Sequence, residues 1–412
     1  MMLIDRPALL ARLRAYRNTD QVKVLVGVRR CGKSTLLDMF RQELVSGGVE
    51  LRNVFVKRLD GFDVPIGYSA EDLHSELQAA MDVSDSTLPF YVFLDEVQDV
   101  SGWELVVRRL QSRANTDVYI TGSNAQLLSG ELSTHLAGRF VEIPVYPLSF
   151  REFAGMDSHR DISPDTLFAE YMRYGGMPGL MTLGDTDERT KTDILAAIFE
   201  SVIVRDVAQR YGIRDLSSLD KLSRYLMATS GNLFSTNSVV NTLRSAGVKT
   251  SYVTIDNQIR ALEQACVIYA AEQEGIRGKE LLHPQRKFYA VDNGLRNLTN
   301  NFTFSDRGAQ LEGIIFMELL RRGYRVTIGR SGTGEIDFVA VSGTSREYIQ
   351  VTLSMLEEST RERELRPLQG LTDAYPRTVL TLDRFSDGVT EEGIRIVNAV
   401  DWLLENDGAT GE

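Results

Sequence analysis

Cysteine, histidine and long apolar runs are all scarce in this sequence. It has two cysteines and four histidines in 412 residues. Two cysteines cannot form a disulfide framework or a four-ligand zinc site, and the histidines show no HxxxH or HExxH spacing. No run of about 18 apolar residues could cross a bilayer, and Asp5, Arg6 and Arg12 stand where a signal peptide needs an apolar run. We therefore expect a cytoplasmic protein without a bound transition metal.

Lysine is missing from the C-terminal third of the chain, where none follows Lys287. The net charge of −11 argues against a protein that coats nucleic acid without regard to its sequence. Its distribution is uneven, because residues 205–300 carry 13 basic and 9 acidic side chains, whereas residues 301–412 carry 12 basic and 19 acidic ones. If nucleic acid binds anywhere, the middle segment is the more suitable face.

Apolar strands and amphipathic helices alternate through the first 150 residues. Leu36, Leu37, Phe40 and Leu44, for example, have the spacing of a helix with one buried face. Strand–helix alternation predicts an α/β fold in which helices cover both faces of a parallel sheet. The strands are expected at residues 21–26, 51–59, 89–95, 117–123 and 140–148.

The predicted secondary structure changes twice in the rest of the chain. From about residue 166 to 264 the pattern is helical, and two amphipathic helices within 235–264 precede two short strands, the order of a winged helix. The Asn-, Thr- and Ser-rich stretch 296–306 is typical of a linker, and a small α/β unit follows it. These changes predict four domains, at residues 1–155, 156–230, 231–298 and 305–412.

One glycine-containing segment has the pattern of a phosphate-binding loop. GVRRCGKS matches GxxxxGK[ST] between an expected strand and an expected helix, the context that this pattern requires. Its two glycines let the backbone turn amide groups toward phosphates, and the helix N-terminus adds its dipole. Lys33 can reach the β- and γ-phosphates of ATP, and the Ser34 hydroxyl can bind Mg²⁺. The expected nucleotide-binding residues are Gly27, Val28, Arg29, Arg30, Cys31, Gly32, Lys33, Ser34 and Thr35.

Polar residues end two later strands. Asp95 and Glu96 follow an apolar run, and ligands bind at the carboxyl ends of strands in open parallel sheets. We expect Asp95 to hold Mg²⁺ together with Ser34, and Glu96 to polarise the attacking water. Ser123 or Asn124 would lie beside the γ-phosphate, with an ordinary strand cap as the equal alternative.

Together these motifs resemble those of the AAA-type ATPases of bacteria and archaea that carry a poorly characterised C-terminal domain. The resemblance implies a AAA-type nucleotide domain followed by helical and winged-helix regions. It also implies that Arg139 lies near a phosphate, for instance that of a neighbouring subunit, as an arginine finger. Pro178 would pack beside the adenine. The alternatives are that Arg139 is an ordinary surface arginine and that Pro178 belongs to a plain turn at the end of a helix. The likeness covers nearly the whole chain and includes GVRRCGKST, FLDEVQDVSGWE, ITGSNAQLLSGELSTHLAGR, VYPLSFREF, YGGMPGL, KFYAVDNGLR and YIQVTLS.

The last unit resembles the restriction-endonuclease-like fold with its PD-(D/E)xK-like pattern. Glu312, Asp337 and Gln350 occupy the places of that fold's acid, acid and acid-or-Gln residues. The resemblance implies Mg²⁺ binding by these side chains and a lysine two residues after the last of them, but that place holds Thr352. Because no lysine follows Lys287, none can substitute from within the domain. We predict a nuclease-like fold without robust cleavage.

The leading hypothesis is magnesium-dependent ATP hydrolysis that drives a conformational change in a homo-oligomer, a hexamer being one arrangement. The alternatives are a nucleotide-gated DNA-binding or scaffold module with negligible turnover, and an ATP-dependent nuclease. DNA, if bound, is expected along residues 235–287, through a recognition helix and a wing. Winged helices in ATPases also serve as protein contacts, and the sequence identifies no protein client. The side chains expected to contact DNA are Lys249, Asn257, Gln258, Arg260, Arg277, Lys279, Arg286 and Lys287.

Overall fold

The chain forms two compact units in the computed structural model. Unit 1 comprises Met1–Tyr146 with Gln264–Cys266, and unit 2 comprises Pro147–Glu263 with Val267–Glu412. None of the helices in the described part of the chain has the length and apolarity to span a bilayer. The structure describes residues 4–124, 136, 138–181, 187–274, 285–303, 306–332, 334–384 and 387–405.

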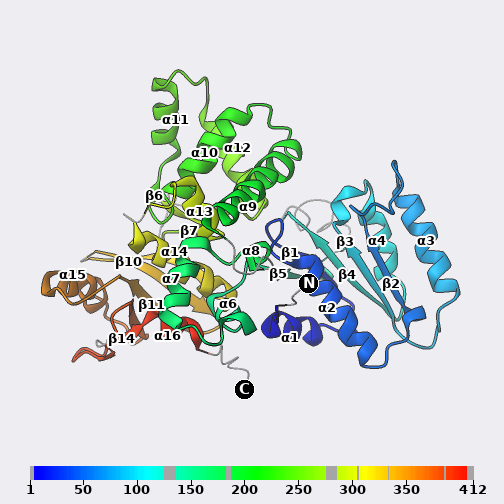
Figure 1. Ribbon diagram of the computed structural model, residues 1–412, viewed down its shortest axis with the longest axis horizontal. Helices are drawn as coiled ribbons and strands as arrows, with labels where there is room; N and C mark the ends of the chain where they lie inside the picture. Colours follow the sequence, from blue (N-terminus) through cyan, green and yellow to red (C-terminus); the bar gives the residue numbers. More distant parts are fainter. Residues whose placement is uncertain are drawn as a thin grey trace. The chain divides into compact units, whose positions relative to one another are not determined.

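A five-stranded sheet forms the centre of unit 1. Its strands run in the order β2-β3-β4-β1-β5, and each pair of neighbours is parallel (Figure 1). All residues of β1 and β3 are buried, as expected of strands covered by helices on both faces of the sheet. The predicted α/β class and parallel sheet are confirmed. The strands are β1 (Val22–Val26), β2 (Val54–Arg58), β3 (Phe90–Asp95), β4 (Thr116–Gly122) and β5 (Phe140–Pro144).

Helices join these strands. The helix α2 (Lys33–Ser46) begins directly after the glycine-containing loop, and its Phe40 ring lies 5.2 Å from the ring of Tyr119 in β4. Ser69 and Asp72 form a capping box at the start of α3, which satisfies two backbone amides that the helix leaves free. The other elements are α1 (Pro7–Ala15), η1 (Leu51–Asn53), α3 (Ala70–Asp82), η2 (Val97–Asp99) and α4 (Trp103–Gln111).

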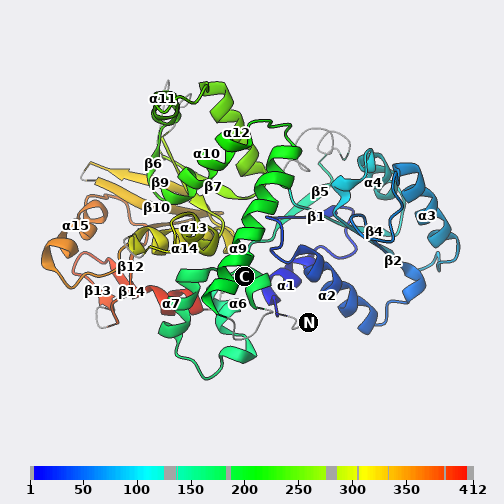
Figure 2. The ribbon, with the colours of Figure 1, turned by 45° about the horizontal axis from the view of Figure 1, so that its top comes forward.

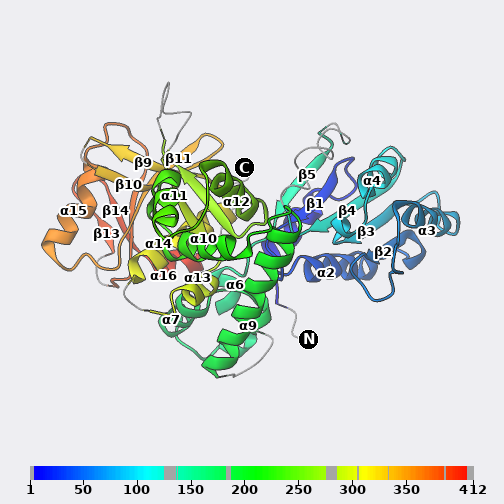
Figure 3. The same ribbon diagram turned by 90° about the horizontal axis from the view of Figure 1, so that it is seen from above.

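Unit 2 begins with a helical region, drawn mainly in green in Figure 3. The two amphipathic helices predicted within 235–264 are present as α11 and α12. A π-helical segment, η5, continues α9. The elements are α6 (Phe150–Ala154), η4 (Asp157–His159), α7 (Pro164–Tyr174), α8 (Pro178–Met181), α9 (Glu188–Ser201), η5 (Val202–Gln209), α10 (Leu216–Ala228), α11 (Thr236–Ser245) and α12 (Tyr252–Gln264).

A small antiparallel sheet comes next. Its strands β6 (Leu233–Phe234), β7 (Ile268–Glu272) and β8 (Arg286–Ala290) are ordered β6-β8-β7. The two strands predicted after α12 are therefore present as β7 and β8, and β6 adds a third strand beside β8.

Helix α13 (Asn293–Thr299) occupies the start of the stretch predicted to be a linker, so that prediction is wrong. The Asp292 side chain caps the helix by accepting a hydrogen bond from the Leu295 amide. Arg296 is 1% exposed and pairs with Asp306 at 2.6 Å. An aspartate before the first helical residue is a helix-start signal, which the polar composition of the stretch obscured.

A six-stranded mixed sheet completes unit 2 (Figure 2), in the order β13-β14-β12-β11-β10-β9. Strands β9, β10 and β11 pair antiparallel, whereas β11, β12 and β14 pair parallel. The elements are α14 (Arg307–Arg321), β9 (Arg325–Ser331), β10 (Gly334–Ser342), β11 (Ser345–Val351), α15 (Glu358–Gln369), β12 (Arg377–Thr381), β13 (Gly388–Val389), β14 (Arg395–Asn398) and α16 (Ala399–Leu404).

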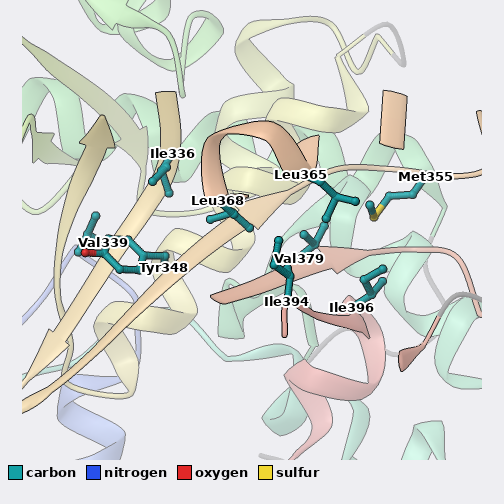
Figure 4. Close-up of a cluster of buried hydrophobic side chains, with 9 residues drawn as sticks. All are labelled: Ile336, Val339, Tyr348, Met355, Leu365, Leu368, Val379, Ile394 and Ile396. Atoms are coloured by element: carbon teal, nitrogen blue, oxygen red, sulfur yellow. The ribbon is translucent and has the colours of Figure 1, made fainter. Parts of the chain in front are cut away.

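Two helices cover opposite faces of this sheet. The Phe338 ring of β10 lies 5.8 Å from the ring of Phe316 in α14. The next residue, Val339, points to the other face, because side chains alternate along a strand. There it belongs to an apolar cluster with Leu365 and Leu368 of α15 (Figure 4).

Candidate functional site

The loop between β1 and α2 has the geometry of a phosphate site. Gly32 has a φ of 101°, which favours glycine, and a Cβ atom at Gly27 would lie 2.0 Å from the carbonyl oxygen of Val145. The Lys33 ammonium group donates to the carbonyl oxygens of Gly27 (2.8 Å) and Val28 (3.1 Å). The lysine and the N-terminus of α2 therefore present positive charge at one loop, as anion binding requires.

The two residues predicted to bind Mg²⁺ lie together. The Ser34 hydroxyl donates to Asp95 Oδ1 over 3.1 Å, and Thr121 of β4 donates to the same oxygen. Burial raises the pKa of Asp95, and the hydrogen bonds from Thr121 and Ser34 oppose that rise. A buried carboxylate beside two hydroxyl groups is a set of hard oxygen donors that suits Mg²⁺. These residues therefore fit the ion.

Glu96 lies beside Asp95 in a strained backbone conformation. Its φ of 55° and ψ of 49° are left-handed, which is unfavourable for a residue with a side chain and is typical of functional sites. Its amide donates to Thr121 Oγ1 over 3.0 Å, and its carboxylate accepts a hydrogen bond from the Gln98 side chain. Thr121 thus aligns both acidic residues, and Gln98 orients the Glu96 carboxylate.

Arg6 is part of this site, although in the sequence it stands out only as a charge that interrupts the apolar N-terminus. It is 5% exposed, and its guanidinium group donates to the carbonyl oxygens of Cys31 (3.2 Å) and Tyr146 (3.0 Å). The Cys31 thiol in turn donates to the carbonyl oxygen of Val145 over 3.0 Å. These bonds tie the loop to the segment after β5. No local pattern indicates Arg6, because its partners are 25 and 140 residues away.

The other residues predicted for the nucleotide site are dispersed. Asn124 is buried at the end of β4, and Arg139 is exposed directly before β5. Arg29 is half-buried and Arg30 is exposed, with a left-handed φ of 66°. Pro178 begins α8 in unit 2. The roles given to these residues toward phosphate and adenine remain predictions.

The predicted recognition helix, α12, offers part of the expected polar face. Lys249 just before it, and Asn257 and Arg260 within it, are exposed. Gln258 is 2% exposed, so the prediction that it contacts DNA is wrong. It belongs to the same buried face as Ile259, because the apolar stripe of a helix spans more than one position per turn.

The predicted wing also has fewer exposed cationic side chains than expected. Lys287 is 5% exposed and therefore cannot act as a surface contact. Arg286 is half-buried, 3.6 Å from the Asp256 carboxylate. Arg277 and Lys279 lie outside the described residues.

The four nuclease-like positions converge in unit 2. Glu312, Asp337, Gln350 and Thr352 all line one cavity of about 680 Å³. The Gln350 side chain accepts a hydrogen bond from the Asp337 amide over 3.3 Å. Lys287 reaches the same group, with its Nζ atom 3.2 Å from Glu312. No lysine comes from within the domain, as expected, but β8, which precedes the domain, supplies one that the sequence did not indicate.

Two family models match the chain. Residues 19–154 match an AAA domain, and residues 165–306 match a domain of unknown function (DUF8612). AAA domains with a P-loop bind ATP and Mg²⁺ in general, and the residues of unit 1 fit both.

Relatives extend the match over the whole chain. An uncharacterized protein of Haemophilus influenzae is 38% identical over 406 residues, which cover 98% of this chain and 99% of that protein. The chain belongs to the family of that protein. An uncharacterized protein of Methanocaldococcus jannaschii, MJ1544, is 29% identical over 84% of this chain and 78% of its own length. Among solved structures, the Walker-type ATPase PABY2304 of Pyrococcus abyssi matches with a TM-score of 0.48 and 18% identity, over 72% of this chain and 96% of that one.

Proposed function

We propose that the chain hydrolyses ATP with Mg²⁺ in unit 1 and uses the reaction to change the arrangement of its two units. The observation that carries this proposal is the meeting of the phosphate loop with the two acidic residues after β3. Ser34 and Asp95 are 61 residues apart in sequence and share a hydrogen bond of 3.1 Å. The AAA-domain match over residues 19–154 supports the same function.

Each side chain has a distinct part in this reaction. Lys33 and the N-terminus of α2 bind the phosphates, and Ser34 and Asp95 hold Mg²⁺, which neutralises charge on the phosphates when bound. Glu96 accepts a hydrogen bond from the water that attacks the γ-phosphorus. Gln98 keeps the Glu96 carboxylate oriented through the hydrogen bond that its amide group donates. The products are ADP and phosphate.

Steady-state phosphate release by the full-length chain tests this function. Lys33→Ala and Glu96→Gln are each expected to lower kcat/KM by on the order of 100-fold, as the loss of a group that stabilises the transition state does. Lys57→Ala and Glu71→Gln are the matched controls, since both residues lie away from the loop on β2 and α3. Equal turnover in the wild type and in both site variants would rule the proposal out.

Assembly is the second part of the proposal. Arg139 is exposed on the surface. In a homo-oligomer, such as a hexamer, its guanidinium group can therefore reach the phosphates bound by a neighbouring copy. The mass of the protein in solution, measured with and without a non-hydrolysable ATP analogue, tests this. Growth of the assembly with the analogue supports it, and a monomer under both conditions contradicts it.

DNA binding through a winged-helix region is a second candidate function. It is favoured by the exposed Lys249, Asn257 and Arg260 at α12. Because Lys249 and Arg260 are the two cations of this face, DNA binding should depend only weakly on salt. The logarithm of the association constant should fall by about 2 for each tenfold rise in salt concentration. Binding of duplex DNA that weakens by this slope, and that Lys249→Ala and Arg260→Ala each reduce, would support the candidate. Binding unchanged in both variants would count against it.

A further inference from the structure

Residues 145–148, which follow β5, form the connecting segment between the two units. The chain first passes from unit 1 to unit 2 between Tyr146 and Pro147. All four residues of the connecting segment are buried, so it is not a solvated linker. Pro147 fixes its own φ and restricts Tyr146 to extended conformations, and Pro144 at the end of β5 acts in the same way. The connecting segment is therefore stiff, and its ends lie at most about 11 Å apart.

The first half of the connecting segment is bound to the phosphate loop of unit 1. The Val145 carbonyl oxygen accepts a hydrogen bond from the Cys31 thiol over 3.0 Å, and a Cβ atom at Gly27 would lie 2.0 Å from it. The Arg6 guanidinium group joins the carbonyl oxygens of Cys31 and Tyr146. Because close-packed interiors are barely compressible and transmit strain, a movement of the loop displaces Val145 and Tyr146.

The second half of the connecting segment is bound within unit 2. The Leu148 amide donates to the carbonyl oxygen of Gly176 over 2.8 Å. The Leu148 carbonyl oxygen accepts from the Tyr171 hydroxyl over 2.7 Å and from Arg321 over 3.5 Å. A Cβ atom at Gly176 would lie 2.2 Å from the same oxygen. Leu148 is 1% exposed, so these hydrogen bonds are made in a low-dielectric interior, where they are stronger than in water.

Gly176 is fixed in turn by a buried carboxylate. Its amide donates to Asp292 over 2.7 Å, and the same carboxylate accepts from the Leu295 amide at the start of α13 over 3.2 Å. Three of the motifs that are far apart in the sequence therefore meet at Leu148, Gly176 and Asp292. These motifs are VYPLSFREF, YGGMPGL and KFYAVDNGLR.

We propose that the connecting segment couples the phosphate loop to unit 2 in both directions, and that Tyr171 is a positioning residue for the ATP site. This coupling rests on the proposed ATPase function, because nucleotide binding supplies the movement of the loop. The movement reaches Leu148 because the two prolines leave little backbone rotation to absorb it. Such coupling is reciprocal, so the bonds that hold Leu148 must also change the affinity of the loop for nucleotide.

Hydrogen exchange of the full-length chain, with and without a non-hydrolysable ATP analogue and Mg²⁺, tests the direction from the loop to unit 2. Peptides of the phosphate loop report nucleotide binding, and peptides that contain Gly176 and Leu295 report the bonds to Asp292. We expect the analogue to slow exchange in the loop and to change exchange at these two amides by about 5-fold. Pro147→Gly frees the backbone and removes no amide donor. In this variant the effect in the loop should remain and the effect in unit 2 should disappear.

Nucleotide affinity tests the direction from unit 2 to the loop. Tyr171→Phe removes only the hydroxyl group that donates to Leu148, and it should weaken binding of a fluorescent ATP analogue by about 5-fold. Tyr225→Phe changes an exposed tyrosine of α10 and should bind like the wild type. In a Pro147→Gly background, Tyr171→Phe should have no further effect on affinity, whereas a general loss of stability would act in both backgrounds.

The results distinguish a failure of this coupling from a failure of the ATPase function. Absence of protection in the wild-type loop would overturn both. Protection in the loop with unchanged exchange at Gly176 and Leu295 would leave nucleotide binding intact and overturn the coupling. An effect in unit 2 that persists in Pro147→Gly, or an equal loss of affinity for Tyr171→Phe in both backgrounds, would also overturn it. Circular dichroism melting shows whether each variant folds, and Pro147→Ala replaces Pro147→Gly if the latter does not.

Discussion

Thr121 connects the two acidic residues of unit 1. Its hydroxyl donates to Asp95 and accepts from the Glu96 amide. The hydrogen bond to Asp95 matters because burial raises the pKa of that carboxyl and the bond opposes the rise. Asp95 must be ionised to hold Mg²⁺, so the threonine keeps the site usable toward lower pH.

Thr121→Val removes this bond without a large change in volume. The pKa of Asp95 should rise further, so the acidic limb of the pH profile of kcat/KM should move to higher pH. At neutral pH the rate should fall by on the order of 10-fold, since the Glu96 amide also loses its partner. Phosphate release between pH 5 and 9 measures both effects. Thr116→Val at the start of β4 is the control, and identical profiles for the two variants would contradict this role.

Arg6 leads to a second testable prediction, because its side chain donates hydrogen bonds to the backbone of the loop and of the segment after β5. Arg6→Ala leaves the Cys31 and Tyr146 carbonyl oxygens without their donor and should weaken binding of a fluorescent ATP analogue by about 10-fold. Arg6→Lys should not rescue it fully, because one ammonium group does not reproduce the planar fork of two donors. Arg113→Ala, at an exposed position of unit 1, is the control. Unchanged affinity in Arg6→Ala would show that the loop holds its shape unaided.

The sequence revealed the residues whose partners lie close by in the chain. Gly32, Lys33 and Ser34 form one continuous loop, so their spacing predicts their geometry. Asp95 was found because strand ends meet at one edge of a parallel sheet. The sequence did not reveal the contacts of Arg6 and Lys287, because their partners come from distant elements and neither residue is part of a local pattern.

At the scale of elements, α13 illustrates how a buried carboxylate can organise a helix. Asp292 caps α13 and also accepts a hydrogen bond of 2.7 Å from the Gly176 amide, after α7. A Cβ atom at Gly175 would lie 2.2 Å from the Asp292 carboxylate. The two glycines and the aspartate thus form one joint between α7 and α13, and this joint lies just before the stretch 296–306 that had been predicted to be a linker.

This joint predicts a pH dependence of stability. Burial raises the pKa of Asp292 to about 6, although hydrogen bonds from backbone amides oppose the rise. An acid whose pKa is higher in the folded than in the unfolded state, where it is about 4, favours the fold when protonated. Its contribution to stability is therefore lost as the pH rises from about 4 to about 6.

Asp292→Asn removes this titration. The variant should be less stable than the wild type at pH 4, because an amide nitrogen cannot accept a hydrogen bond. Relative to the wild type it should then gain up to about 3 kcal/mol between pH 4 and 7. Urea unfolding followed by Trp402 fluorescence in a Trp103→Phe background reports on unit 2, since these are the two tryptophans of the chain. Parallel pH curves for the two proteins would refute the linkage.

At the scale of the whole molecule, an arginine that acts on a neighbour predicts complementation. Arg139→Ala and Lys33→Ala should each be inactive alone. An equimolar mixture should regain part of the ATPase activity, because an intact loop of one copy then meets an intact arginine of another. Phosphate release from the mixture, compared with the sum of the separate variants, measures the gain. If no activity returns while mixed assemblies form, Arg139 acts within its own chain or not at all.

The position of Lys287 affects where this chain can be divided into domains, both by truncation and in evolution. The lysine belongs to β8 and the acids belong to α14 and β10, so the C-terminal sheet is not a portable module. A recombination event or a truncation between β8 and α14 would remove this lysine from the domain, together with the Tyr289 ring that stacks on Phe316. Descendants should therefore keep or lose the lysine and the acids together, although a boundary drawn by fold alone would separate them.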